Sequence, residues 1–383
     1  MIIDTRSEPV VEKKRRTTKN SFWVKGGYTD YQSIFLIFVI VLFGLMMVYS
    51  ASSYRAIRSG LPGTYFMVRQ AIFGVIGFIG MYAISRVNYR YLSNLSLVLM
   101  YAAIAMQVFV LILGRASHGA TRWIELGPVQ LQPSEIAKPI IIIYMADACV
   151  KKSKYLNSII GIFKLVLLPV ICIGLIAVEN LSTAIICFAI VVAILFVASP
   201  KLFNLFILGI IGIAVAAILA FGVGYRSDRF EAWRHPETSD SGFQTLQSLY
   251  AIGSGGFFGR GLGNSIQKLG FLPESHNDMI FSVICEELGL FGALVVITLF
   301  IMLIFRFKFI ADGAIDSFGG FIITGVITHV AVQIIVNIGV VTNTIPPTGV
   351  TLPFISYGGT SLIFMLAEIG LVLSVARQMS LTE

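Results

Sequence analysis

Long runs of apolar residues alternate with short polar connections along most of the chain. A helix needs about 20 mostly apolar residues to cross the hydrocarbon core of a bilayer. About ten runs of this length are predicted to be transmembrane helices: 33–51, 66–84, 94–114, 134–150, 160–178, 181–198, 202–222, 279–305, 317–339 and 355–376. The runs are continuous and do not alternate with period two, so the pattern favours an all-α polytopic membrane protein over a β-barrel.

Three places depart from this regular pattern. The fourth run carries Glu135 and Lys138 in its first turn and is the weakest of the ten. The fifth and sixth runs almost touch, so Glu179-Asn180 must form a very tight turn. The connection 340–354 is rich in Pro and Thr, which predicts a rigid flap without a helix.

Composition supports the membrane assignment. Hydrophobic residues make up 56% of the 383 residues and charged residues only 13%, whereas soluble domains contain about 25% charged residues. The four cysteines lie in or beside apolar runs without a CxxC spacing. They are therefore expected to be buried apolar residues and not disulfide or metal sites.

The basic residues set the expected orientation. Placing the N-terminus inside puts the Lys-Lys-Arg-Arg run of 13–16 on the cytoplasmic side, where Lys and Arg accumulate. Both termini are then cytoplasmic, with a basic tail 1–32, a membrane domain 33–376 and a short tail 377–383. The longest outer loop, 223–278, joins helices seven and eight. Anionic lipid accounts for the net charge of +8, and nucleic acid is not an expected partner.

Several basic residues lie on the predicted outer side, against this rule. They are therefore candidates for binding an anionic group rather than topology signals. The set comprises Arg55, Arg58, Arg115, Arg122, Arg226, Arg229, Arg234, Arg260 and Lys268.

The stretch 253–289 gathers glycines and ionisable residues just before a long apolar run. Ionisable groups concentrated at such a place in a membrane protein indicate a functional site. The glycines of 253–263 do not follow a strand in a βαβ unit, which argues against a dinucleotide fingerprint. Three interpretations of the glycines remain: a close backbone approach, a nest of N–H groups for a phosphate, or a flexible loop.

Asp278 is the central candidate within this stretch. It could cap the following helix, where an acid is favoured, or act as a general base with Glu274 and His276 nearby. The helix dipole would lower the pKa of Asp278, whereas desolvation and a neighbouring carboxylate would raise it. Glu286 and Glu287 belong either to a helical extension at the outer surface or to the membrane interior, where they need partners.

Other polar groups have a structural and a functional interpretation each. Glu135 and Lys138 share a helix face, where they form a local ion pair or face a cavity in which Lys138 meets an anion. Arg122-Trp123 could add a phosphate contact and a stacking surface to that cavity. Ser356-Tyr357 precedes the last span and forms at least a turn. The stripe of His329, Gln333 and Asn337 on the ninth span indicates hydrogen bonds between helices.

Several long motifs occur in an order that resembles a known family. They are GLMMVYSASS, FMVRQ, ATRWIELGPVQLQPSEIAK, ENLSTA, QSLYAIGSGGFFGRGLGNSIQK, LPESHNDMIFSVICEELG and PPTGVTLPFISYGGTSL. Together they resemble the SEDS family (shape, elongation, division and sporulation), the polytopic peptidoglycan polymerases that include FtsW, RodA and SpoVE. GRGLGNSIQK and NIGVVTNTIPPTGV are most similar to the division-type branch. NDMIF and ENLSTA are similar to Gram-positive, clostridia-like members.

The resemblance implies a ten-helix glycosyltransferase that polymerises lipid II into a glycan strand outside the cytoplasmic membrane. It also implies a class B penicillin-binding protein as the transpeptidase partner, other divisome membrane proteins, and a location at the division septum. The family's essential outer-loop aspartate falls on Asp278. Its glutamate and lysine at the start of the fourth span fall on Glu135 and Lys138.

These expectations combine into a hypothesis for the reaction. Asp278 takes a proton from the acceptor sugar, while Lys138, Arg122 and an outer-loop arginine such as Arg226 or Arg260 bind the pyrophosphates. Lys268, Glu274, His276, Ser356 and Tyr357 complete the predicted site. No cofactor and no set of metal ligands can be identified from the sequence. A divalent cation, Mg²⁺ or Mn²⁺, is a candidate to share the pyrophosphate charge. The alternatives are a lipid II flippase and an elongation or sporulation polymerase.

Overall fold

The computed structural model describes residues 22–24, 27–113, 115–117, 120–126, 129–201, 203, 206–207, 209–210, 212, 230–238 and 242–379. Helices make up most of this part. They are α1 (Tyr31–Arg58), α2 (Tyr65–Arg86), the 3-10 helix η1 (Tyr89–Tyr91), α3 (Leu92–Leu113), α4 (Pro133–Lys151), the 3-10 helix η2 (Ser153–Asn157), α5 (Ile159–Glu179), α6 (Leu181–Ala198), α9 (Phe243–Gly255), α10 (Ile280–Asp312), α11 (Ser317–Val341) and α12 (Gly359–Ala376).

Eight helices in the described part of the chain are long and apolar enough to cross a membrane. They comprise α1, α2, η1 with α3, α5, α6, α10, α11 and α12. The protein is thus an all-α polytopic membrane protein, as the apolar runs predicted. The predicted fourth span forms α4, which is not among the eight. Most of the predicted seventh span, 202–222, lies outside the described residues.

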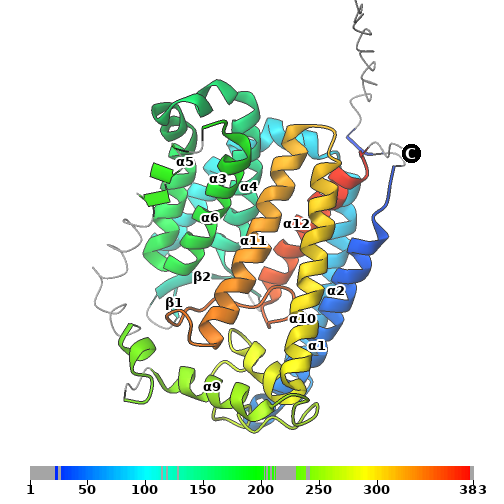
Figure 1. The fold of residues 1–383 in the computed structure, drawn as a ribbon, viewed down its shortest axis with the longest axis vertical. Helices are drawn as coiled ribbons and strands as arrows, with labels where there is room; N and C mark the ends of the chain where they lie inside the picture. Colours follow the sequence, from blue (N-terminus) through cyan, green and yellow to red (C-terminus); the bar gives the residue numbers. More distant parts are fainter. Residues whose placement is uncertain are drawn as a thin grey trace, which may run out of the picture.

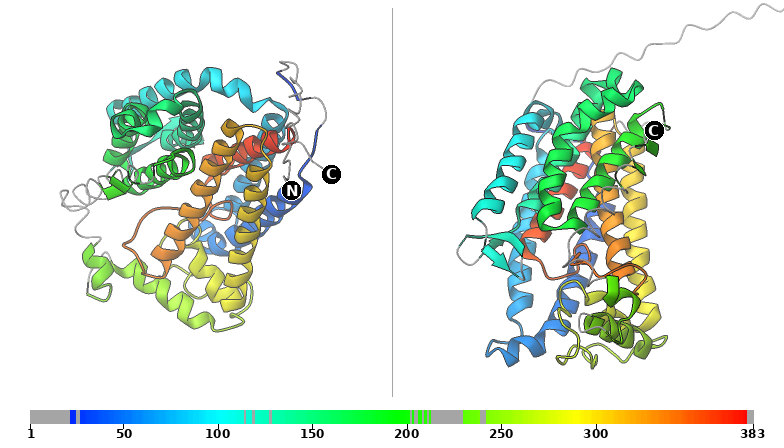
Figure 2. Two further views of the ribbon diagram at one scale, coloured as in Figure 1. Left: turned by 45° about the horizontal axis from the view of Figure 1, so that its top comes forward. Right: turned by 90° about the vertical axis from the view of Figure 1, so that its left-hand side faces the viewer.

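The described helices form one bundle. α1 begins and α12 ends at one end of the bundle, whereas α9 and the strands lie at the opposite end (Figures 1 and 2). An even number of membrane crossings from α1 to α12 would place the start of α1 and the end of α12 on the same side, as observed. That the shared end is cytoplasmic stays a prediction from the basic residues.

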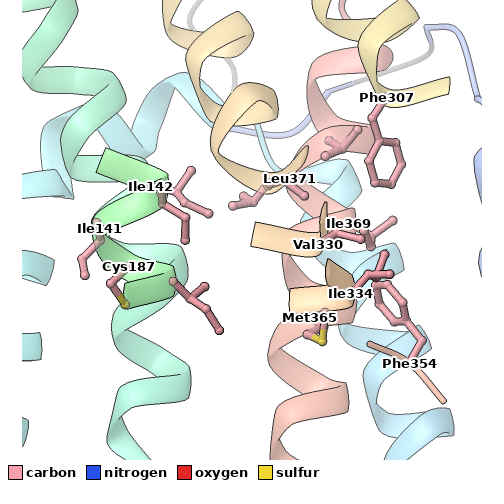
Figure 3. Close-up of a cluster of buried hydrophobic side chains, with 14 of the residues drawn as sticks. Ile141, Ile142, Cys187, Phe307, Val330, Ile334, Phe354, Met365, Ile369 and Leu371 are labelled. Atoms are coloured by element: carbon pink, nitrogen blue, oxygen red, sulfur yellow. The ribbon is translucent and has the colours of Figure 1, made fainter. Parts of the chain in front are cut away.

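Among the described α-helices, α4 has the largest share of buried residues. Fifteen of its 19 residues are buried, and it packs against α3, α5, α6, α11 and α12. Apolar side chains from α4 and α6 face those of α11 and α12 across the core (Figure 3); they include Ile141, Ile142, Cys187, Val330, Ile334, Met365 and Ile369. All four cysteines are buried and free, as predicted. The span that looked weakest is therefore surrounded by protein, which explains how it carries charges.

A small sheet between α3 and α4 was not expected from the sequence. β1 (Arg115–Ser117), β2 (Ala120–Leu126) and β3 (Val129–Leu131) form an antiparallel sheet in the order β1-β2-β3. Such short strands contain no long apolar run, so hydropathy gives no signal for them.

Two predicted connections are confirmed. α5 ends at Glu179 and α6 begins at Leu181, with Asn180 alone between them. The Asn180 side chain accepts a hydrogen bond from the Thr183 amide at 3.2 Å and so caps α6. The segment after α11 forms no helix or strand until α12, as its Pro and Thr content predicted.

The glycine-rich segment packs its backbone directly against α10. A Cβ atom on Gly255 would lie 1.9 Å from the Cys285 carbonyl oxygen, and one on Gly259 would lie 2.2 Å from the Glu287 oxygen. α10 is interrupted at Gly289, where φ is 68° and ψ is −167°. The amides of Arg260 and Gly261 donate to carbonyls of the interrupted turn at 2.9 Å. Of the three interpretations, the close backbone approach is therefore confirmed.

Candidate active site

Asp278 lies in the turn that leads into α10. The helix begins at Ile280 with Met279 as its N-cap residue, whose side chain makes no capping hydrogen bond. Asp278 therefore precedes the first turn, contrary to the capping interpretation. Its side chain is partly buried, and its backbone carbonyl accepts a hydrogen bond from the Asn337 amide of α11 at 2.7 Å.

His276 is enclosed by aromatic rings two residues before Asp278. Only 2% of the residue is exposed, and its ring centroid lies 4.9 Å from Phe66 and 5.7 Å from Tyr357. The Tyr357 amide donates to the His276 carbonyl at 2.9 Å. Burial, reinforced by the Arg55 charge, lowers the pKa of His276 to about 4. The imidazole is thus neutral at physiological pH.

Glu274 joins the same turn to α1. Its carboxylate lies 3.1 Å from the Arg55 guanidinium, and its backbone has a φ of 53°, which is unusual for a residue other than glycine. Desolvation raises the pKa of Glu274, but the hydrogen bond and charge of Arg55 outweigh it, so the net pKa is lowered. The ion pair places a carboxylate and a guanidinium at the end of the bundle where α1 ends.

The low pKa of His276 predicts acid sensitivity of the fold. Its folded pKa of about 4 lies below its ordinary value of 6.5, so this contribution to stability is complete above pH 6.5 and is lost as pH falls towards 4. The loss is expected to reach about 3 kcal/mol. The pH dependence of Tm in detergent measures it. His276→Gln should flatten the curve, whereas His235→Gln, at an exposed position, should not; parallel curves for wild type and His276→Gln would contradict the assignment.

The loop before α12 connects this turn to the second group of predicted residues. Tyr357 of the loop contacts His276, and Ser361 in the first turn of α12 donates to the Glu135 carboxylate at 2.7 Å. Ser356 and Ser361 both line one small cavity between the loop and α12. The Ser356 hydroxyl accepts from the Leu352 amide at 2.8 Å and so also closes a turn.

Glu135 and Lys138 form a local ion pair, which was one of the two alternatives for their shared helix face. Lys138 Nζ lies 2.8 Å from Glu135 Oε1, and both side chains are buried. The polar stripe of α11 also makes the predicted hydrogen bonds between elements. His329 bonds Glu368 of α12 at 2.7 Å, and Gln333 donates to the Thr351 carbonyl at 3.0 Å.

Glu286 and Glu287 are fully buried in α10 before its interruption. Glu287 accepts from Lys268 at 2.6 Å and from the Ser50 hydroxyl of α1 at 2.7 Å. Glu286 accepts from the Ile266 amide at 2.9 Å. Both acids therefore have partners within the protein, and together they fasten the loop 256–272 to α10 and α1.

The predicted anion-binding cations divide into three groups. Lys138 and Lys268 each face a buried carboxylate. Arg260 is 36% exposed and lies 3.9 Å from Glu286. Arg226 and the side chain of Arg122 lie outside the described residues. Their binding roles, like those of the other predicted site residues, stay predictions.

Two functional candidates on α2 escaped the sequence reasoning. Arg69 is close enough to Tyr357 to oppose the rise in the pKa of its hydroxyl that burial causes. Gln70 donates to the Ser356 carbonyl at 3.0 Å and accepts from the Gly358 amide at 3.2 Å. The motif FMVRQ contains both residues and was the available signal.

The described residues provide no preformed metal cage. Among them, no group of three or more His, Cys, Asp or Glu side chains could hold a metal ion. Mg²⁺ is often bound by one or two carboxylates together with substrate phosphates, so a requirement for Mg²⁺ or Mn²⁺ stays a prediction.

A family model described as "cell cycle protein", FtsW/RodA/SpoVE, matches residues 31–381. The chain belongs to the FtsW/RodA/SpoVE family. A probable peptidoglycan glycosyltransferase FtsW of Geobacter sp. strain M18 is 38% identical over 357 residues, covering 91% of this chain and 97% of that protein. Stage V sporulation protein E of Bacillus subtilis is 37% identical over 359 residues, with shares of 91% and 97%.

Solved structures of FtsW/RodA/SpoVE-like chains agree with the fold. A chain in a peptidoglycan synthase complex that coordinates polymerization and crosslinking has a TM-score of 0.75 and 27% identity, covering 91% of this chain and 98% of that one. The rod shape determining protein RodA of Thermus thermophilus has a TM-score of 0.68 and 27% identity, with shares of 92% and 97%.

Proposed function

We propose that this family member is a peptidoglycan glycosyltransferase that polymerises lipid II on the outer face of the cytoplasmic membrane during cell division. The observation that carries the proposal is identity of 36–38% over nearly the whole chain to relatives named probable peptidoglycan glycosyltransferase FtsW. The polar cluster around Asp278 fits this activity, because it lies at the start of α10 and at the bundle end opposite the start of α1 (Figure 1).

The proposed reaction is one displacement at the anomeric carbon of the growing chain's lipid-linked sugar. Asp278 accepts the proton of the acceptor sugar 4-hydroxyl as its oxygen forms the new glycosidic bond. The bond to the lipid pyrophosphate breaks, the pyrophosphate leaves with the electron pair, and the configuration changes from α to β. A positioned general base typically contributes about 10²–10⁴-fold to such a rate.

Cations at the outer end would stabilise the leaving pyrophosphate. Arg55, Arg58 and Arg69 belong to the described connection between α1 and α2 or its flanking turns, and they join Lys138, Arg260, Arg122 and Arg226 as candidates. Guanidinium groups suit this role because they bind phosphate oxygens through two parallel hydrogen bonds. Lys268 would have to leave Glu287 to take part.

The division role and the partners are part of the proposal. We assign a class B penicillin-binding protein as the transpeptidase partner and the division septum as the location, with other divisome proteins nearby. The peptidoglycan synthase complex with a matching chain supports a partner of this kind. A sporulation relative is 37% identical, so identity alone does not separate division from sporulation. The relatives come from genera as different as Geobacter and Bacillus, so a clostridia-like origin stays a prediction from the motifs.

Polymerisation in detergent micelles separates the enzyme from a flippase. Micelles have no second leaflet, so transport of lipid II across a bilayer cannot contribute to the result. The purified protein with its transpeptidase partner is expected to convert lipid II into glycan strands there. Absence of strands, together with lipid II transfer across the bilayer of proteoliposomes, would instead support the flippase.

A further inference from the structure

Asn337 of α11 links the turn that carries Asp278 to the connection that precedes α12. The residue is fully buried. Its amide nitrogen donates to the Asp278 carbonyl at 2.7 Å and to the Val350 carbonyl at 2.8 Å. A single side chain thus joins three parts of the chain that are distant in sequence.

These two bonds use both hydrogens of the primary amide. Both acceptors are carbonyl oxygens, and the NH₂ group can donate one hydrogen to each. The Asn337 Oδ1 atom is buried and has no hydrogen-bond partner among the described residues. The two bonds of the nitrogen therefore set the orientation of the amide.

Backbone hydrogen bonds hold the Asp278 turn from within and from outside. Residues 273–279 form neither helix nor strand. The amides of Asn277 and Met279 bond the Glu274 carbonyl within the turn, and the Tyr357 amide bonds the His276 carbonyl from outside it. The bond from Asn337 acts on the peptide group of Asp278 itself, and it comes from a helix of 25 residues.

We propose that Asn337 is a positioning residue for Asp278. By holding the Asp278 carbonyl against α11 and the Val350 connection, Asn337 sets the direction in which the Asp278 carboxylate meets the acceptor sugar. The proposal rests on the function proposed above, in which Asp278 is the general base. Asn337 does not touch the substrate in this role, so it affects the rate of the bound complex rather than the affinity for lipid II.

Gln333 provides a matched control on the same helix. It lies one turn before Asn337 and is also buried. Its amide donates to the Thr351 carbonyl at 3.0 Å, in the same connection that Asn337 contacts through Val350. Loss of the Gln333 amide therefore weakens the attachment of the connection to α11 without removing the bond to Asp278.

The test measures kcat and KM for lipid II polymerisation by the full-length protein in complex with its transpeptidase partner. Asn337→Leu and the nearly isosteric Asn337→Asp are compared with Gln333→Leu. We expect both Asn337 variants to lower kcat by about 10- to 100-fold, since small displacements of a catalytic group have effects of this size. KM should stay at its wild-type value, and Gln333→Leu should retain the wild-type kcat.

Three results would overturn the proposal: wild-type kcat in both Asn337 variants, an equal loss in Gln333→Leu, or failure of both Asn337 variants to fold while Gln333→Leu folds. The last would make Asn337 a folding residue. Asp278→Asn is measured in parallel to separate this proposal from the proposed function. Normal polymerisation by Asp278→Asn would refute the general base, whereas an inactive Asp278→Asn beside fully active Asn337 variants would refute the positioning role alone.

Discussion

Asp278→Asn is expected to abolish polymerisation of lipid II while the protein remains folded. Asparagine has nearly the same shape as aspartate, but its amide cannot accept a proton at physiological pH. The backbone carbonyl at this position still accepts the bond from Asn337, so the turn before α10 should keep its conformation. The rate should fall by about 10²–10⁴-fold, as measured by the appearance of glycan strands on a gel.

Two further variants show whether the charge or the position of the carboxylate matters. Asp278→Glu keeps the base but moves it by one methylene, so it should retain part of the activity. Asp312→Asn removes an exposed acid at the other end of α10 and should polymerise like the wild type. Strands from Asp278→Asn at the wild-type rate would place the base elsewhere, with Glu135 as the next candidate.

Lys268→Met is expected to destabilise the protein strongly. Lys268 Nζ lies 2.6 Å from Glu287 Oε1, with side-chain exposures of 6% and 0%. Removing the cation leaves a buried carboxylate whose charge is uncompensated, which costs about 3–5 kcal/mol of stability. Glu287→Gln should have a similar effect, because it leaves a buried ammonium group. Thermal unfolding in detergent, followed by size-exclusion chromatography, measures both losses.

The double variant tests whether the charges themselves cause the loss. Lys268→Met with Glu287→Gln removes both charges and leaves a side-chain oxygen to accept from Ser50. Its Tm should recover most of the way to the wild-type value. The exposed pair Lys308–Asp312 serves as the control, and Lys308→Met should change stability by about 0–1 kcal/mol. Equal effects of Lys268→Met and Lys308→Met would contradict a structural role for the buried pair.

The membrane spans could be predicted because lipid leaves few alternatives. Unsatisfied backbone groups are costly in a bilayer, so an apolar run of suitable length becomes a helix. The run 160–178 became Ile159–Glu179, and 181–198 became Leu181–Ala198. The sheet of residues 115–131 and the central place of α4 could not be predicted in this way. Both depend on contacts within the protein and not on partition into lipid.

The candidate site could be predicted in part. The density of ionisable groups after the glycine run pointed to Asp278, and the spacing of Glu135 and Lys138 placed them on one helix face, with an ion pair as one of two alternatives. The sequence did not reveal that Lys268 pairs with Glu287 or that Asn337 bonds the Asp278 carbonyl. These contacts join loops and helices whose mutual placement depends on how the bundle packs. The sequence alone does not distinguish a lysine or arginine that neutralises a buried carboxylate from one that binds a phosphate.

The measurement that tests the central claim most directly is polymerisation of lipid II in micelles by wild type and Asp278→Asn, each purified with the transpeptidase partner. Both samples are first matched for Tm and for complex formation. The account predicts glycan strands from the wild-type complex and none from the Asp278→Asn complex. Strands from both complexes at equal rates would contradict Asp278 as the general base.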